Sequence, residues 1–211
     1  GCQIEIDGIV SGKDLMDLKT LFDDYDCDKS SKHSYHEYYE KEFAHLKDEP
    51  INFLEIGTYL GASTQAFHEY FTKATIYTMD IFKRTRPEHL PILKENRVKW
   101  LKGDSTNAGL PLRIADQWGD VEFDIVIDDG AHYPEANEYT FKNIFPMTKG
   151  AYYIEDVFPL DKMQPNKWTA SKPEEYDIMK YYRFLDTIGK HTVWDNRKNK
   201  HPDSYIIKVT K

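Results

Sequence analysis

The amino-acid sequence predicts an α/β fold in which a mainly parallel, seven-stranded sheet carries helices on both faces and ends in an antiparallel hairpin. Three observations support this prediction. From residue 51 onward, short apolar runs alternate with stretches of helical spacing, as in parallel strands joined by crossover helices. A glycine-containing turn follows the first apolar run, and the last two runs flank a turn near the C-terminus.

Two helices are expected before the first strand. Residues 13–25 and 34–47 both place apolar side chains at helical spacing. Ser34 is the expected N-cap of the second helix, and Glu37, three residues later, would complete a capping box. We interpret residues 1–50 as a helical cap over the main domain.

Seven strands are expected where apolar and β-branched residues cluster between turn signals. They are residues 51–56, 75–81, 98–104, 123–129, 151–156, 191–195 and 204–209. Further helices are expected at residues 62–71, 87–96, 106–118, 134–145 and 174–189. Residues 157–173 form a long connection rich in Pro, Lys and polar residues, and such loops are usually functional or disordered.

Composition limits the class of protein. The chain has 211 residues and a net charge of −8 without a basic stripe, which argues against a nucleic-acid partner. Cys2 and Cys27 lack the spacing of a disulfide framework or a metal site, so a reducing, cytoplasmic compartment is expected. No apolar run is long enough to span a membrane. The sequence leaves a homo-oligomer open.

A glycine turn follows the first strand, in the segment FLEIGTYLGAST at residues 53–64. Gly57 and Gly61 let backbone approach a ligand, and the helix that follows offers free N–H groups. Their spacing matches neither the phosphate-binding P-loop nor the dinucleotide fingerprint. Glu55 would repel a pyrophosphate but tolerates a cationic ligand. The alternative is a tight turn that binds nothing.

Polar residues at other strand ends extend this candidate site. Asp80, at the end of the second strand, is placed to accept hydrogen bonds from ribose hydroxyls, or to cap a helix. Residues 103–105 follow the third strand, where an adenine would lie, although Asp104 is equally suited to capping the next helix. The complete set of expected cofactor-binding residues is Glu55, Gly57, Thr58, Gly61, Ser63, Asp80, Ile81, Gly103, Asp104, Ser105 and Asp128.

Four carboxylates end two strands of the predicted sheet. Asp128 and Asp129 end the fourth strand, and Glu155 and Asp156 end the fifth. Neighbouring parallel strands bring such groups into one space, where they repel one another unless a cation lies between them. Oxygen ligands favour Mg²⁺, Mn²⁺ or Ca²⁺ over zinc. The alternative is that these acids cap helices and face solvent.

The chain resembles the class I S-adenosylmethionine (SAM)-dependent methyltransferases, and more narrowly the macrocin and mycinamicin sugar O-methyltransferases, a group often labelled cephalosporin hydroxylase-like. Residues 28–43, 51–64, 76–81, 123–141 and 152–157 carry the resemblance. It implies a Rossmann-like fold, SAM as the methyl donor, a Mg²⁺ or Mn²⁺ ion, and methylation of a sugar hydroxyl, with a rhamnose in a glycan as a candidate acceptor.

The resemblance also implies roles for single residues. Asp129, Glu155 and Asp156 would bind the metal, and His132 would be the general base. An imidazole with an ordinary pKa of about 6.5 suits that role, although a lone histidine is more often structural.

Acceptor contacts are assigned to aromatic residues. The expected substrate residues are Tyr35, Tyr39, Tyr133 and Trp168, for which core packing or a surface loop is the alternative. The chain starts at Gly1, so residues 51–211 are interpreted as a methyltransferase domain excised from a larger glycan-synthesis protein.

Four other functions are alternatives to this interpretation. A metal-dependent methyltransferase of catechols or other vicinal diols would keep the same metal and cofactor sites. An iron-dependent hydroxylase would favour two histidines and one carboxylate, a cluster the sequence does not reveal. A non-catalytic SAM-binding module would not need the base and the metal acids together. A nicotinamide dehydrogenase is disfavoured by the glycine spacing.

Overall fold

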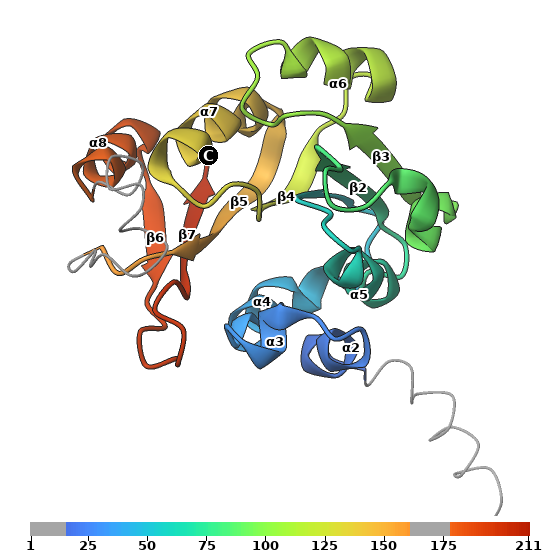
Figure 1. Ribbon diagram of the computed structural model, residues 1–211, viewed down its shortest axis with the longest axis horizontal. Helices are drawn as coiled ribbons and strands as arrows, with labels where there is room; N and C mark the ends of the chain where they lie inside the picture. The colour runs from blue at the N-terminus through green and yellow to red at the C-terminus, as the bar shows by residue number, and fades with distance from the viewer. Residues whose placement is uncertain (1–15, 161–177) are drawn as a thin grey trace, which may run out of the picture.

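The computed structural model describes residues 16–160 and 178–211 (Figure 1). One seven-stranded sheet has the order β3-β2-β1-β4-β5-β7-β6. Its strands are β1 (Asn52–Ile56), β2 (Thr75–Asp80), β3 (Val98–Lys102), β4 (Phe123–Asp128), β5 (Thr148–Val157), β6 (His191–Trp194) and β7 (Tyr205–Thr210). Strands β1 to β5 are mutually parallel, whereas β7 is antiparallel to both β5 and β6. The predicted sheet and its C-terminal hairpin are therefore confirmed.

Helices cover both faces of this sheet (Figure 1). On one face pack α2 (Leu18–Asp24), α4 (Tyr35–Phe43) and α5 (Ala62–Tyr70), with the short α3 (Asp28–Ser31) between the first two. On the other pack α6 (Leu110–Trp118), α7 (Pro134–Ile144) and α8 (Ile178–Ile188). Alternate strand residues supply the two cores. In β1, Phe53 joins the first, and Leu54 and Ile56 join the second.

The N-terminal helices share a core with the sheet, joined by aromatic side chains. The ring of Tyr39 stacks on Phe43, with 5.0 Å between centroids, and packs edge-on against Tyr153 of β5. Tyr38 stacks on Trp194 of β6 at 5.1 Å. These contacts hold α4 against the sheet, so that α3 and the start of α4 lie near the carboxyl ends of the central strands.

Three local predictions were wrong. Residues 87–96 form two 3₁₀ helices, Pro87–His89 and Pro91–Lys94, because Pro91 cannot donate the hydrogen bond that a continuous helix needs at its position. Ser34 is in the left-handed region, with φ of 56°, and makes no capping hydrogen bond. The helix expected from residue 106 begins only at Leu110, after a series of turns.

The predicted long connection and the predicted last helix include residues that the structure does not describe. The long connection at residues 157–173 and the start of the helix expected at 174–189 lie mostly outside the described residues. In residues 16–160 and 178–211, no helix has the length and apolar character needed to cross a membrane.

Candidate metal and cofactor site

The candidate site lies at the carboxyl ends of β1, β2, β4 and β5. Strand order reverses between β1 and β4, because β2 follows on one side of β1 and β4 lies on the other. In open parallel sheets, this switch point leaves a crevice in which ligands bind. The polar groups of the predicted site are distributed around it.

Gly57 makes the close approach of β1 and β4 possible. Its φ is +98°, and a Cβ built on it would lie only 2.2 Å from the carbonyl oxygen of Asp129. The N–H of Asp129 in turn donates to the carbonyl oxygen of Ile56 at 2.9 Å. Only a residue without a side chain fits here. The glycine turn therefore brings the end of β1 against Asp129, the first acid of the candidate metal site.

The acid of the glycine turn is enclosed by protein. Glu55 is fully buried and accepts hydrogen bonds from Ser63 Oγ at 2.5 Å and from Thr64 Oγ1 at 2.9 Å. Burial raises the pKa of Glu55 to about 7, against the opposing effects of Lys29 and of its two hydroxyl donors. Glu55 and Ser63 thus join β1 to the start of α5, whose N-cap is Gly61 in the left-handed conformation.

The end of β2 carries Asp80, whose carboxylate organises the neighbouring backbone. It accepts the N–H of Tyr59, from the glycine turn, at 2.9 Å and the N–H of Phe82 at 2.8 Å. Ile81 beside it is 45% exposed. The hydroxyl of Thr58 is buried against that of Thr78 at 2.6 Å. Asp80 and Ile81 therefore lie next to the glycine turn, and the Thr58 hydroxyl faces the sheet.

The loop after β3 is held by its own side chains and by side chains of α6 and α7. Asp104 accepts hydrogen bonds from the backbone and the hydroxyl of Thr106, at 2.9 and 2.7 Å. It does not cap the next helix, the alternative to adenine binding, because the N-cap of α6 is Gly109. Ser105 Oγ lies 2.8 Å from Thr140 Oγ1 of α7. A Cβ on Gly103 would lie 2.7 Å from a guanidinium nitrogen of Arg113.

Asp128 belongs to the same crevice but is buried. It accepts hydrogen bonds from Gly130 N–H and from Asn137 Nδ2, both at 3.1 Å. Burial raises its pKa to about 6, although these two donors oppose the effect.

A buried lysine lies between two of the predicted metal ligands. Lys29 of α3 is 1% exposed, and its Nζ donates to Glu155 Oε2 at 2.5 Å and to Asp129 Oδ2 at 2.9 Å. Tyr39 donates to the other oxygen of Glu155 at 2.7 Å. Both oxygens of Glu155 therefore have a donor. Burial raises the pKa of this carboxyl well above its usual value, and the charge of Lys29 opposes that shift.

Tyr35 holds Asp156 in an unusual backbone conformation. Asp156 has φ of +58°, which is rare for a residue with a side chain. The hydroxyl of Tyr35 accepts the N–H of Asp156 at 2.9 Å and donates to Asp156 Oδ1 at 2.6 Å. Tyr35 and Tyr39, expected to contact substrate, are both fully buried and lie behind the acids that they hydrogen-bond.

His132 faces these acids from near the end of the loop that joins β4 to α7. Its Nε2 lies 3.3 Å from Asp156 Oδ2 and 3.7 Å from Asp129 Oδ1. Its Nδ1 is buried and has no hydrogen-bond partner among the described residues. Burial alone would lower the pKa of His132, but the carboxylates of Asp156, Asp129 and Asp128 outweigh it, and the pKa is raised.

The donor atoms here fit a divalent cation. Asp129, His132 and Asp156 each offer an atom, and these atoms lie within 4.8 Å of one another. Carboxylate oxygens suit Mg²⁺ and Mn²⁺. Burial raises the pKa of Asp156, and repulsion from Asp129 raises it further. A cation between the two carboxylates would relieve this repulsion. Glu155 lies beside this group, with Lys29 and Tyr39 on its oxygens.

Three residues at this edge were not predicted from the sequence: Lys29, His33 and Asp203. Lys29 and His33 lie within a segment that carries the family resemblance, but an isolated lysine or histidine in a polar stretch gives no signal of its own. Of the remaining predicted substrate residues, Tyr133 is the N-cap residue of α7, without a side-chain capping bond, and Trp168 lies outside the described residues.

Comparisons with known proteins agree on one kind of relative. No protein-family model matches the chain. Over 144 residues it is 36% identical to 8-demethyl-8-(2-methoxy-alpha-L-rhamnosyl)-tetracenomycin-C 3'-O-methyltransferase of Streptomyces olivaceus, a match that covers 64% of this chain and 32% of the relative. Demethylmacrocin O-methyltransferase of Streptomyces fradiae is 31% identical over 167 residues, 74% of this chain and 38% of the relative.

A solved structure gives the same picture. The MycE methyltransferase of mycinamycin biosynthesis, in complex with Mg and SAH, matches 93% of this chain and 55% of its own, with a TM-score of 0.69 and 25% identity. The chain spans about a third of the length of the curated relatives it matches.

Proposed function

Because the chain belongs to the class I SAM-dependent methyltransferases and is similar to their macrocin and mycinamicin sugar-modifying members, we propose that it transfers the methyl group of SAM to a hydroxyl of a sugar, with a divalent metal ion at the site. The observation that carries this proposal is the meeting of Asp129, His132 and Asp156 at the strand ends beside the glycine turn.

SAM would bind over the ends of β1 and β2. The turn around Gly57 and the left-handed Gly61 leave backbone open to a ligand, and α5 begins there with its free N–H groups. Asp80 lies next to that turn, at the place where a carboxylate accepts hydrogen bonds from ribose hydroxyls in this architecture. The structural neighbour named above contains SAH, the demethylated product of SAM.

Asp129 and Asp156 would hold the metal ion, and Glu155 stays a predicted third ligand. When bound, a divalent ion stabilises negative charge on an acceptor oxygen as that oxygen loses its proton. Lys29 balances part of the carboxylate charge, and Tyr35 fixes the direction of Asp156. Both residues are buried and so act on the acceptor only through the acids that they hold.

His132 would remove the proton. Its Nε2 faces the two acids, so an acceptor hydroxyl held beside them lies within its reach. The acceptor oxygen attacks the methyl carbon as the bond from carbon to sulfur breaks, and the proton passes to Nε2 of His132. Transfer is direct, so no covalent intermediate with the enzyme forms, and most of the acceleration comes from positioning and electrostatics.

The acceptor is proposed to carry vicinal hydroxyls, with rhamnose in a glycan as the first candidate. One relative is named as acting on a rhamnosyl group, and another on demethylmacrocin. The test is mass spectrometry of rhamnosides, other deoxyhexosides and catechols incubated with the protein, SAM and Mn²⁺ or Mg²⁺. We expect a sugar to gain the mass of one CH₂ unit, because the methyl group replaces the hydroxyl hydrogen. Methylation of catechols alone would establish the diol alternative, and no transfer to any acceptor would contradict the proposal.

A variant separates the base from the rest of the site. His132→Ala should keep SAM binding and lose about 10²- to 10⁴-fold of turnover, the usual effect of removing a general base. Normal turnover by this variant would show that the proton leaves by another route. A chelator should abolish wild-type activity, and Mn²⁺ should restore it.

A further inference from the structure

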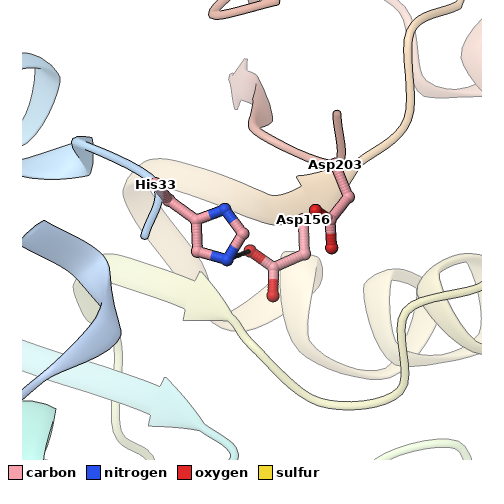
Figure 2. Close-up of side chains that lie close together, drawn as sticks. All are labelled: His33, Asp156 and Asp203. Carbon is pink, nitrogen blue, oxygen red and sulfur yellow. Dashed lines mark ion pairs between the residues drawn. The ribbon is translucent and has the colours of Figure 1, made fainter. Parts of the chain in front are cut away.

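A second group of ligand-type side chains lies beside the first. His33 precedes α4, Asp156 is the penultimate residue of β5, and Asp203 lies in the loop between β6 and β7 (Figure 2). Each offers an atom, and these atoms lie within 4.8 Å of one another. The three residues come from segments far apart in the chain, and the cap, the sheet and the terminal hairpin bring them together.

Hydrogen bonds fix which nitrogen of His33 carries a proton. His33 Nδ1 lies 2.9 Å from Ser204 Oγ. The single hydroxyl hydrogen of Ser204 is directed to the carbonyl oxygen of His201 at 2.7 Å, and Asn199 Nδ2 donates to the same Oγ. Ser204 Oγ must therefore accept from His33, so the proton is on Nδ1. In the neutral ring, Nε2 then carries a lone pair.

That lone pair is directed at the two acids. His33 is 6% exposed, and its Nε2 lies 3.7 Å from Asp156 Oδ1, which is too far for a hydrogen bond. Figure 2 shows Asp156 on the Nε2 side of the ring, with Asp203 beyond it. Among the described residues, the carboxylate of Asp203 has no hydrogen-bond or ion-pair partner. An imidazole that donates one N–H to a fixed oxygen and presents the other nitrogen to carboxylates has the arrangement of a metal ligand.

The ring of His33 is held rigidly in this direction. It stacks on Tyr35, with 4.9 Å between centroids and 12° between planes, and Asn196 Nδ2 donates to the carbonyl oxygen of His33 at 2.8 Å. Tyr35 also clamps Asp156. One tyrosine therefore positions two of the three candidate ligands. Such preorganisation is expected of a binding site whose ligands are in place before the ion binds.

The two oxygens of Asp156 face different histidines. Oδ2 faces His132 at 3.3 Å, and Oδ1 faces His33 at 3.7 Å. A carboxylate with one oxygen directed to each of two clusters is suited to bridge two cations, as in two-metal sites.

We propose that His33, Asp156 and Asp203 form a second divalent-cation site that shares Asp156 with the proposed first one. Its mixed nitrogen and oxygen donors favour Mn²⁺ over Mg²⁺, because imidazole is a poor ligand for Mg²⁺. The second site depends on the proposed first site only through the shared residue Asp156. An experiment can therefore contradict one site without contradicting the other.

The test is the number of Mn²⁺ ions bound per chain, counted by loss of the free-ion signal in electron paramagnetic resonance. Wild-type protein should bind two. Asp203→Asn should bind one, or bind the second about 100-fold more weakly, and His33→Gln should act in the same way. Asp195→Asn removes one charge from the same connection between β6 and β7, where Asp195 pairs with Arg197, and should still bind two.

The outcomes separate the two sites. A single ion in the wild type, with Asp203→Asn unchanged, would overturn the second site. Loss of one ion in Asp129→Asn but none in Asp203→Asn would also overturn the second site, and it would support the first site. No Mn²⁺ binding at all would overturn both. An equal loss in Asp195→Asn would show that only general charge attracts the ion, and would also overturn the second site.

Discussion

At the scale of single residues, Asp156 is constrained both by its backbone and by its contacts. It has a left-handed backbone, buried surroundings and two imidazoles on opposite oxygens, and Tyr35 satisfies both its N–H and Oδ1. Backbone strain of this kind costs about 1–3 kcal/mol and persists only where the surroundings enforce it. The left-handed backbone directs the Asp156 carboxylate toward both histidines, which an extended backbone at the end of β5 would not do.

Lys29 should be among the most costly residues to replace. Lys29→Met removes the only lysine that ion-pairs with Asp129 and Glu155 among the described residues, and leaves both acids short of a cation in a buried setting. We expect a loss of about 3–5 kcal/mol in the free energy of unfolding, measured by urea denaturation without added metal. Lys19→Met breaks an exposed pair with Asp23, which water already screens, so its loss should be much smaller. Equal losses in the two variants would contradict the importance given to Lys29.

Glu55 should make the stability of the ligand-free protein fall as the pH rises. Burial raises its pKa from 4.5 to about 7, so the folded state holds the proton more tightly than the unfolded chain. The contribution is complete below about pH 4.5 and is lost as the pH rises through about 7, with a total of up to about 3 kcal/mol. Urea midpoints between pH 5 and 8 should fall less steeply in Glu55→Gln. An unchanged slope would mean that Glu55 ionises normally.

At the scale of elements, the turn after β1 depends on a missing side chain. Gly57→Ala combines a left-handed φ with a Cβ only 2.2 Å from the Asp129 carbonyl oxygen, so β1 or β4 must move. We expect a loss of more than about 3 kcal/mol and weaker SAM binding, measured by urea denaturation and calorimetry. Gly189→Ala has a similar φ, but its Cβ meets nothing within 4 Å, so it should cost only about 1–2 kcal/mol and leave SAM binding unchanged. Similar losses in both variants would mean that the contact with Asp129 does not matter.

The elements that could be predicted are those with a strong local pattern. All seven strands have apolar runs, and the parallel order placed Asp80, Asp129 and Asp156 at one edge. The single helix expected at residues 87–96 is wrong because Pro91, within it, cannot donate the backbone hydrogen bond that a continuous helix needs there. Residues Asp28–Ser31 were missed because four residues are too few to show a helical period.

The site was predicted only where it follows from strand ends. The acids of β4 and β5 had to meet, since neighbouring parallel strands end together. Lys29 reaches Glu155 across 126 positions of sequence, and Asp203 meets His33 through packing of the hairpin against the cap. Such contacts depend on how whole layers pack, which no local pattern contains. The roles of Tyr35 and Tyr39 were unforeseen for the same reason, because their hydroxyls point to the acids from inside the core.

At the scale of the whole molecule, the candidate site joins three parts of the chain. The cap supplies Lys29 and His33, the sheet supplies Asp129 and Asp156, and the terminal hairpin supplies Asp203. Anything that binds these groups together must favour the folded state, because the unfolded chain separates them. Ion binding should therefore stabilise the entire fold and not only the loops at the strand ends.

This argument gives a quantitative expectation for the melting temperature. An ion that binds only the folded state at about 100 times its dissociation constant adds about 2.7 kcal/mol, and in a chain of this size each kcal/mol raises Tm by roughly 2–4 °C. Saturating Mn²⁺ should thus raise Tm by roughly 5–10 °C in differential scanning calorimetry, and a chelator should reverse the shift. Asp129→Asn should show a smaller shift, whereas Asp124→Asn, an acid at the opposite end of β4 that pairs with Lys149, should show the wild-type one. If Mn²⁺ leaves Tm unchanged, or shifts both variants equally, the ion does not bind where the cap, sheet and hairpin meet, and the proposed metal site is wrong.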